Sequence, residues 1–168
     1  MSPDALVRQY ADLVYRVCLR VTKTDDDAAD ATQDALVKVW QNVADVEPDR
    51  QRAWCARVAR NAALDLLRRR QVRPAPGRAE AITEPECDDV LPDGHAEAGD
   101  LRAELHRAVG ALDEPYRSIL VLREIEGLAY AEIADALDLK LNTLKVYLHR
   151  ARRRVRDALT ESAPELVP

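Results

Sequence analysis

The sequence predicts an all-α protein: two small helical domains joined by a flexible acidic linker, with a helix-turn-helix in the C-terminal domain. Apolar residues recur at steps of three and four through most of the 168-residue chain, the spacing that gives a helix one buried face. A central stretch rich in proline and glycine lacks this period and separates two helical blocks. Hydrophobic residues make up 47% of the chain and include no phenylalanine, so each block can bury a core that is mainly aliphatic.

The first predicted domain, residues 1–72, contains three helices. Pro3 suits the first turn of a helix that runs to about Val21. The acidic run after Thr22 suits the start of a second helix, whose inward apolar positions include Trp40. A third helix begins near Asp49 and ends in a basic cluster. This cluster consists of Arg68, Arg69, Arg70 and Arg73.

Residues 73–99 are predicted to be a linker, because four prolines and three glycines interrupt the helical period there. From Glu80 to Glu104 there are nine acids against one basic residue, Arg102, which gives a local charge of −8. One interpretation is that the acids keep a disordered tether extended and soluble. The other is that an acidic tether imitates nucleic acid inside a basic channel of a partner.

The second predicted domain spans residues 100–162 and is followed by a tail, residues 163–168. Its first helix runs from about Asp100 to Leu112, and a second helix follows Pro115 and stops at Gly127. Two further helices follow, separated by a tight turn, and have the pattern of a helix-turn-helix. The turn consists of Asp138, Leu139 and Lys140, and the buried stripe of the last helix of Leu141, Leu144, Leu148, Ala151 and Val155.

The last helix carries a concentration of positive charge. Between Lys140 and Arg156 there are seven Lys or Arg residues and no acid, in a chain whose net charge is −5. Such a density on one helix suits contact with the phosphate backbone of DNA. A plainer interpretation is a solvated helix whose basic residues complement the helix dipole. The short helix and turn that precede this segment favour DNA binding.

Several classes of function have no support in the sequence. Cys18, Cys55 and Cys87 lack the spacing of a zinc site or a disulfide framework, and the thiols of Cys18 and Cys55 are expected to be buried. No apolar run approaches the roughly 18 residues that span a bilayer, so no membrane insertion is expected. No phosphate loop or nucleophile motif is present. We therefore expect a cytoplasmic protein that is not an enzyme and holds no metal or cofactor.

Three segments of the chain, in this order, are DAADATQDALVKVW, WCARVARNAALDLLRRR and LDEPYRSILVLREIEGLAYAEIADALDLKLNTLKVYLHRARRRVR. Together they resemble the two domains of a bacterial extracytoplasmic-function (ECF) sigma factor of the sigma-70 family, regions 2 and 4. The resemblance implies that the first domain docks on the clamp helices of core RNA polymerase and opens the minus-ten promoter element. It implies that the second domain binds the flap tip and reads the minus-thirty-five element of promoter DNA. An anti-sigma factor is a further partner implied by the family.

The resemblance also implies a role for particular residues. Asn61 matches a position that contacts an unstacked base of the minus-ten element, a role that suits an amide with both a donor and an acceptor. The implied polymerase-binding residues are Asp30, Gln33 and Asp34, and the implied backbone contacts of the minus-ten element are Arg57, Arg60, Arg68 and Arg69. The implied minus-thirty-five contacts are Asn142, Thr143, Lys145, Val146, Tyr147, Arg150 and Arg153.

The recognition helix departs from the family pattern. Lys140 stands where a serine cap is usual, Asn142 where glycine is common, and Val146 and Tyr147 where serine and arginine usually lie. On a helical wheel Val146 lies about 200 degrees from the buried Leu144, so its side chain is expected to face outward. There it either contacts a thymine methyl group, with a phosphate contact from Tyr147, or lies beneath a regulatory protein.

The sequence thus favours an RNA polymerase sigma factor that directs the core enzyme to specific promoters and initiates transcription. Two alternatives remain at this level. One is a helix-turn-helix regulator that binds duplex DNA by itself, with the first domain as a sensor or dimerisation unit. The other is an adaptor that keeps the sigma fold and polymerase binding but has lost promoter reading.

Overall fold

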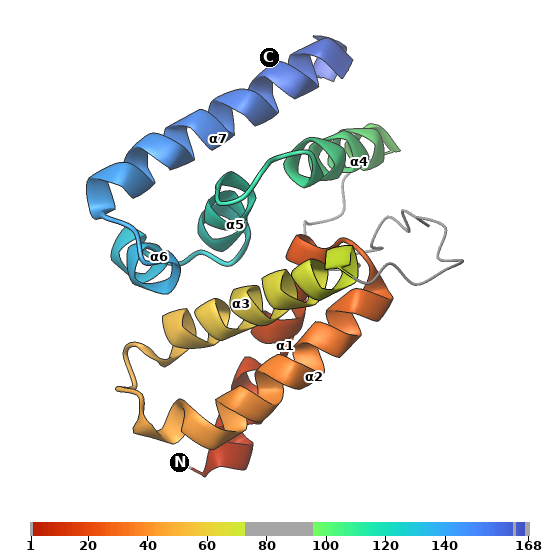
Figure 1. The fold of residues 1–168 in the computed structure, drawn as a ribbon. Coiled ribbons are helices and arrows are strands. Elements are labelled where there is room, and N and C mark those ends of the chain that lie inside the picture. The colour runs from red at the N-terminus through yellow and green to blue at the C-terminus, as the bar shows by residue number, and fades with distance from the viewer. Residues whose placement is uncertain (1, 73–95, 163, 167–168) are drawn as a thin grey trace.

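The computed structural model describes residues 2–72, 96–162 and 164–166. Every regular element within these ranges is helical, which confirms the predicted all-α class. Figure 1 shows α1, α2 and α3 as one group of long helices, with α4 to α7 stacked against it as a second group. The acidic stretch predicted as a linker lies mostly at residues 73–95, outside the described residues.

Helix α1, Pro3–Thr22, begins and ends at recognisable caps. The Ser2 hydroxyl accepts a hydrogen bond from the Ala5 amide at 3.3 Å, and proline occupies the first turn. The helix ends where Lys23 adopts the left-handed conformation, with φ of 68°. Both predicted ends are confirmed to within a residue.

Helix α2, Asp25–Asn42, packs through small residues. Thr24 caps its first turn, which contains the acids that predicted a helix start. A short 3₁₀ turn, η1, Val43–Asp45, then leads toward α3, Gln51–Val72. The buried side chains of α2 include Ala28, Ala31, Ala35 and Val39. Because these side chains are short, α1 and α3 can approach α2 closely.

Trp40 is a correction to the predicted core. The sequence placed this side chain on the inward face of α2, but 53% of its surface is exposed, and its indole Nε1 donates to Asp4 Oδ1 at 3.1 Å. Val39, the preceding residue, is fully buried. A step of one residue turns a helix by about 100 degrees, which carries Trp40 beyond the narrow strip that α1 and α3 cover.

The second group begins with α4, Ala96–Gly110. The predicted linker, residues 73–99, therefore ends too late, since residues 96–99 are helical. Helix α5, Tyr116–Leu120, continues into η2, Val121–Ile125, a π-helical turn. The predicted helix after Pro115 is present, but its last turn is widened, with the Glu126 amide bonded to the Val121 carbonyl at 3.0 Å. Gly127, with φ of 67°, ends it as expected.

The helix-turn-helix consists of α6, Tyr130–Leu137, and α7, Leu141–Ser162, followed by a short 3₁₀ turn, η3, Pro164–Leu166. The predicted turn between the two helices is confirmed, and it is made possible by Asp138 in the left-handed conformation. Leu141 was predicted to be buried but is exposed, since it begins α7 beyond the neighbouring helices. The largest fully buried side chains of this second group are Ile119, Leu122, Leu128, Ile133, Leu144 and Leu148.

The two helix groups also pack on each other. Helix α6 lies against α3, and α5 and η2 lie against α1 (Figure 1). The buried residues of both groups belong to one continuous apolar cluster. Within the described ranges, no helix combines the length and the apolar character needed to cross a lipid bilayer.

Candidate polymerase and nucleic-acid interface

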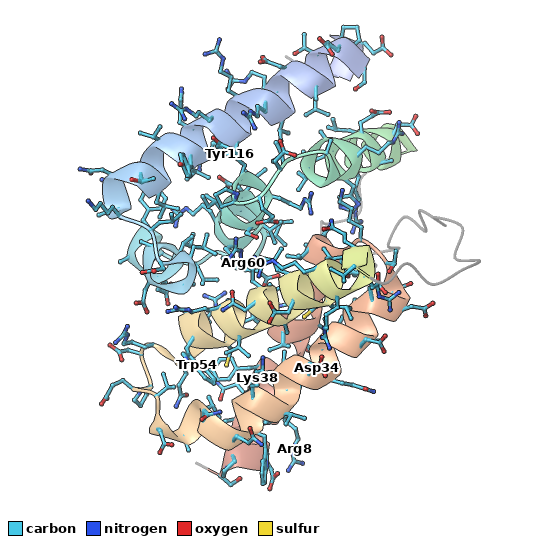
Figure 2. The ribbon with its side chains drawn as sticks, viewed as in Figure 1. Arg8, Asp34, Lys38, Trp54, Arg60 and Tyr116 are labelled. Carbon is cyan, nitrogen blue, oxygen red and sulfur yellow. The ribbon has the colours of Figure 1, made fainter. Side chains whose placement is uncertain are left out.

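The outer face of α2 carries the side chains predicted to bind the polymerase. Asp30, Gln33 and Asp34 are all exposed there, and Figure 2 labels Asp34 on this helix. Val37 and Trp40 continue the same side of α2, with 57% and 53% of their surfaces exposed. Sequence reasoning did not include these two residues in the site. Val37 follows Asp34 by three residues and Trp40 follows Val37 by three, and this helical spacing was the available signal.

The acids of this face are paired within the domain. Asp34 Oδ2 lies 3.1 Å from Arg69 Nη2, and Asp30 Oδ2 lies 3.3 Å from a nitrogen of Arg70. Both members of the Asp34–Arg69 pair are exposed, so the pair contributes roughly 0–1 kcal/mol to stability. A basic partner surface can therefore replace Arg69 at little cost.

The predicted minus-ten residues divide between two environments. Arg57, Asn61 and Arg68 are exposed and follow one another along a single side of α3. Arg68 Nη1 lies 3.4 Å from Asp65 Oδ1 on the same helix. Arg69 turns toward α2, where it meets Asp34. The structure thus brings three of the five predicted residues onto one open face.

Arg60 lies in the other environment, between the two helix groups, as Figure 2 shows. Its Nε donates to Ser118 Oγ at 3.0 Å, and its Nη2 lies 3.5 Å from Glu114 Oε2. Ser118 also donates to the Glu114 carboxylate, so the three side chains form one cluster. Arg60 is mostly buried by these contacts. The sequence offered no signal for them, because the partners lie more than fifty residues away along the chain.

The predicted minus-thirty-five residues lie on the recognition helix α7. Most are exposed, while Thr143 and Tyr147 are half-buried. Val146 has 47% of its surface exposed, which confirms the outward orientation deduced from the helical wheel. The exposed members are Asn142, Lys145, Val146, Arg150 and Arg153. They recur at steps of three or four and therefore share one side of the helix.

Tyr147 packs against the domain instead of projecting fully from it. Its ring lies 5.1 Å from the ring of Tyr116 on α5, measured between centroids, at an interplanar angle of 48°. The guanidinium of Arg154 lies 4.4 Å from the centroid of the same Tyr116 ring. These contacts hold α7 against α5. Tyr147 lies three residues after the buried Leu144 and four before the buried Ala151, so the helical period already indicated its inward lean.

Two of the seven basic residues between Lys140 and Arg156 contact other side chains of the same domain. Arg154 lies over Tyr116, and Arg152 Nε donates to Glu124 Oε1 at 2.7 Å. The hydrogen bond to Glu124 raises the pKa of Arg152 above its ordinary value. The other five are exposed: Lys140, Lys145, Arg150, Arg153 and Arg156. They leave a positive surface along the helix that suits a phosphate backbone.

The described cysteines are buried, as expected. Burial raises the pKa of the Cys18 thiol to about 11 and that of the Cys55 thiol to about 12. Such thiols stay protonated at neutral pH and react slowly. Cys87 lies outside the described residues. In the described part of the chain, no group of three or more His, Cys, Asp or Glu side chains is arranged to hold a metal ion.

Comparisons with known proteins agree with this arrangement. The family model for Sigma-70 region 2 matches residues 6–73, and that for Sigma-70, region 4, matches residues 102–155. The chain is 35% identical to the ECF RNA polymerase sigma factor SigE of Mycolicibacterium smegmatis, over 98% of this chain and 64% of that protein. It therefore spans about two thirds of that relative's length.

Other relatives are matched over most of their length. The chain is 30% identical to the ECF RNA polymerase sigma factor SigL of Mycobacterium tuberculosis, over 94% of this chain and 88% of that one. Among solved structures, the sigma factor RpoE bound to the anti-sigma factor NepR from Bartonella quintana has a similar fold. The TM-score is 0.69 at 22% identity, over 93% of this chain and 95% of that one. The two matched regions and these relatives show that the chain belongs to the family of extracytoplasmic-function (ECF) RNA polymerase sigma factors.

Proposed function

We propose that this sigma factor joins core RNA polymerase in the bacterial cytoplasm, directs it to specific promoters and initiates transcription there. The observation that carries the proposal is the presence of both sigma regions in order along the chain. Each region presents an exposed face of the required chemistry: acidic and apolar on α2, basic on α7. The chain would supply the promoter address and strand opening, while the polymerase would supply the chemistry.

Polymerase binding is assigned to the outer face of α2. Asp30, Gln33 and Asp34 would pair with basic side chains of the clamp helices. Val37 and Trp40 would add apolar area at the C-terminal end of the same face. A large exposed tryptophan beside exchangeable ion pairs is a common composition for a protein interface. The second domain would hold the flap tip.

Minus-ten recognition is assigned to α3. Asn61 would read an unstacked base through its amide, while Arg57 and Arg68 would bind the phosphates on either side. Arg60 and Arg69 belong to the same set, but each must leave its present partner before it can reach DNA.

Minus-thirty-five recognition is assigned to the exposed side of α7. Lys145, Arg150 and Arg153 would bind phosphates or base edges, and Val146 would contact a thymine methyl group in the major groove. The remaining contacts are assigned to Asn142, Thr143 and the hydroxyl of Tyr147.

An anti-sigma factor is the proposed regulatory partner. Two solved sigma factors of similar fold were determined as complexes, RpoE with the anti-sigma factor NepR and CnrH with the cytosolic domain of CnrY. The exposed apolar side chains Val37, Trp40 and Val146 are the surfaces such a protein would cover when the sigma factor is idle.

The direct test is run-off transcription with core polymerase on a promoter library. The wild-type chain should give specific transcripts only with the core enzyme. The triple variant Lys145→Ala, Arg150→Ala, Arg153→Ala should lose promoter-directed transcription but still bind core polymerase. Unchanged transcription would contradict the assignment of α7. An operator footprint without polymerase would favour a stand-alone regulator, and tight core binding without any specific transcript would favour an adaptor.

A further inference from the structure

The exposed indole of Trp40 is held by a residue from another helix. Its Nε1 donates to Asp4 Oδ1 at 3.1 Å, although 53% of the Trp40 surface is exposed. Trp40 lies in the last turn of α2, and Asp4 lies in the first turn of α1. The two helices run antiparallel, which brings these two ends together (Figure 1). The hydrogen bond therefore joins residues that are 36 positions apart in the sequence.

The start of α1 leaves the Asp4 carboxylate available for this contact. The side-chain cap of the helix comes from Ser2, whose hydroxyl accepts a hydrogen bond from the Ala5 amide. An acid in the first turn also complements the helix dipole, which is the ordinary explanation for Asp4. That explanation accounts for the charge of the side chain. It does not account for the contact with the indole, since the interaction with the dipole needs no partner from α2.

A hydrogen bond to the indole restricts a side chain that would otherwise sample several rotamers. A partner that binds a mobile side chain must fix it, and this loss of freedom weakens binding. Because tryptophan has only two side-chain torsions, the effect is modest, about two- to fivefold in the dissociation constant. The bond to Asp4 fixes Trp40 before any partner arrives. It presents the ring on the side of α2 that also carries the exposed Val37.

We propose that Asp4 is a positioning residue for polymerase binding. It holds the Trp40 indole in the orientation in which the ring, together with Val37, meets the clamp helices. The first turn of α1 thereby supports the binding surface without touching the partner. This inference rests on the polymerase-binding role proposed for α2, and it adds a residue that the proposed function does not include.

Two substitutions at Asp4 separate the hydrogen bond from the charge. Asp4→Ala removes both the charge and the acceptor, whereas Asp4→Asn removes the same charge but keeps an amide oxygen that can accept from the indole. Both variants lose the same interaction with the helix dipole, so a difference between them reports the hydrogen bond. Asp12→Ala removes another exposed acid from α1 and is the charge control. Far-UV circular dichroism checks that every full-length variant stays helical.

Affinity for core polymerase is the first measurement. Biolayer interferometry with immobilised core enzyme gives the Kd of each variant. Asp4→Ala should weaken binding about two- to fivefold, whereas Asp4→Asn and Asp12→Ala should stay close to the wild type. In a Trp40→Ala background, Asp4→Ala should have no further effect, because Asp4 acts only through the indole.

The motion of the Trp40 ring is the second measurement. The substitution Trp54→Phe leaves Trp40 as the one tryptophan of the chain. Time-resolved fluorescence anisotropy then reports how freely the indole moves on the nanosecond timescale. Asp4→Ala should increase the amplitude of this motion, and Asp4→Asn should restore it to the wild-type value. A role of Asp4 confined to the stability of α1 would leave the motion of the ring unchanged.

The outcomes separate the positioning role from the proposed function. Wild-type affinity in Asp4→Ala, together with weaker binding by Trp40→Ala, would overturn the positioning role and leave the assignment of α2 standing. Equal losses in Asp4→Ala and Asp4→Asn would assign the effect to charge and overturn it as well. An undiminished effect of Asp4→Ala in the Trp40→Ala background would mean that Asp4 contacts the polymerase itself, which contradicts positioning. Wild-type affinity in Trp40→Ala would contradict both the inference and the place of Trp40 in the proposed function.

Discussion

Replacement of Tyr116 by leucine tests how the recognition helix is held. Tyr116 receives the Tyr147 ring at 5.1 Å and the Arg154 guanidinium at 4.4 Å, so one α5 side chain braces α7 at two points. Figure 2 labels this tyrosine between α5 and α7. Leucine keeps apolar bulk at this position but offers no ring for either partner.

The expected loss follows from these two contacts. A tilted aromatic pair is worth about 0.5–1.5 kcal/mol beyond the area it buries. A cation–π contact with an exposed arginine adds about 0.5–1 kcal/mol. Tyr116→Leu should therefore lower the free energy of unfolding of the second helix group by about 1–2.5 kcal/mol. For a domain of this size each kcal/mol corresponds to a fall of about 4–8 °C in Tm.

The assay exploits the position of the tryptophans. Trp40 and Trp54 both lie in the first helix group, so tryptophan fluorescence reports that group, while far-UV circular dichroism reports both. The Tyr116→Leu transition should shift by circular dichroism more than by fluorescence. Tyr116→Phe is the matched control and should change stability little, since it keeps the ring. If leucine and phenylalanine variants are equally stable, the ring contacts do not brace α7.

Two further predictions concern α2 and the buried thiols. Asp34→Asn should weaken binding of the chain to core polymerase in a pull-down. It should lower the free energy of unfolding by no more than about 1 kcal/mol, because the Asp34–Arg69 pair is exposed. The control variant Asp65→Asn breaks another exposed pair and should leave core binding unchanged. Cys18 and Cys55 have pKa values raised by burial to about 11 and about 12, so their contribution to stability is full below the unfolded thiol pKa near 9 and is lost as pH rises toward 11 to 12. Urea unfolding across this alkaline range should show that the free energy of unfolding falls as pH rises, and a variant with both Cys18 and Cys55 replaced by alanine should show a smaller fall. An equal fall in both proteins would mean that other groups cause it.

Capping residues, turn residues and apolar periodicity were enough to predict most of the helices. The cap at Ser2 and the turn around Asp138 follow from residue types acting on their own backbone. The outward orientation of Val146 follows from its angle to Leu144 on a single helix. In each case the deciding interaction lies within a few residues of the chain.

Helical periodicity gave the wrong burial where the result depended on how much of a helix surface the neighbouring helices cover. The period shows that Val39 and Trp40 both lie near the inward side of α2, but it does not show how far round the helix the neighbours reach. Alanines at the contact let α1 and α3 come close to α2 and leave Trp40 outside. The predicted burial of Leu141 was wrong for the same reason, since the first residue of α7 projects beyond the helices that cover Leu144.

The sequence by itself determined the helical class, the two regions in their order, and the basic side of α7, because these depend on periodicity and on charge close together along the chain. Only the tertiary structure decided which predicted DNA-binding side chains are open and which are occupied. Arg60 meets Ser118, and Arg16 meets Glu126, across 58 and 110 residues of sequence. Such pairs form only once two helix groups dock, and the geometry of docking is a property of packed surfaces that no local pattern contains.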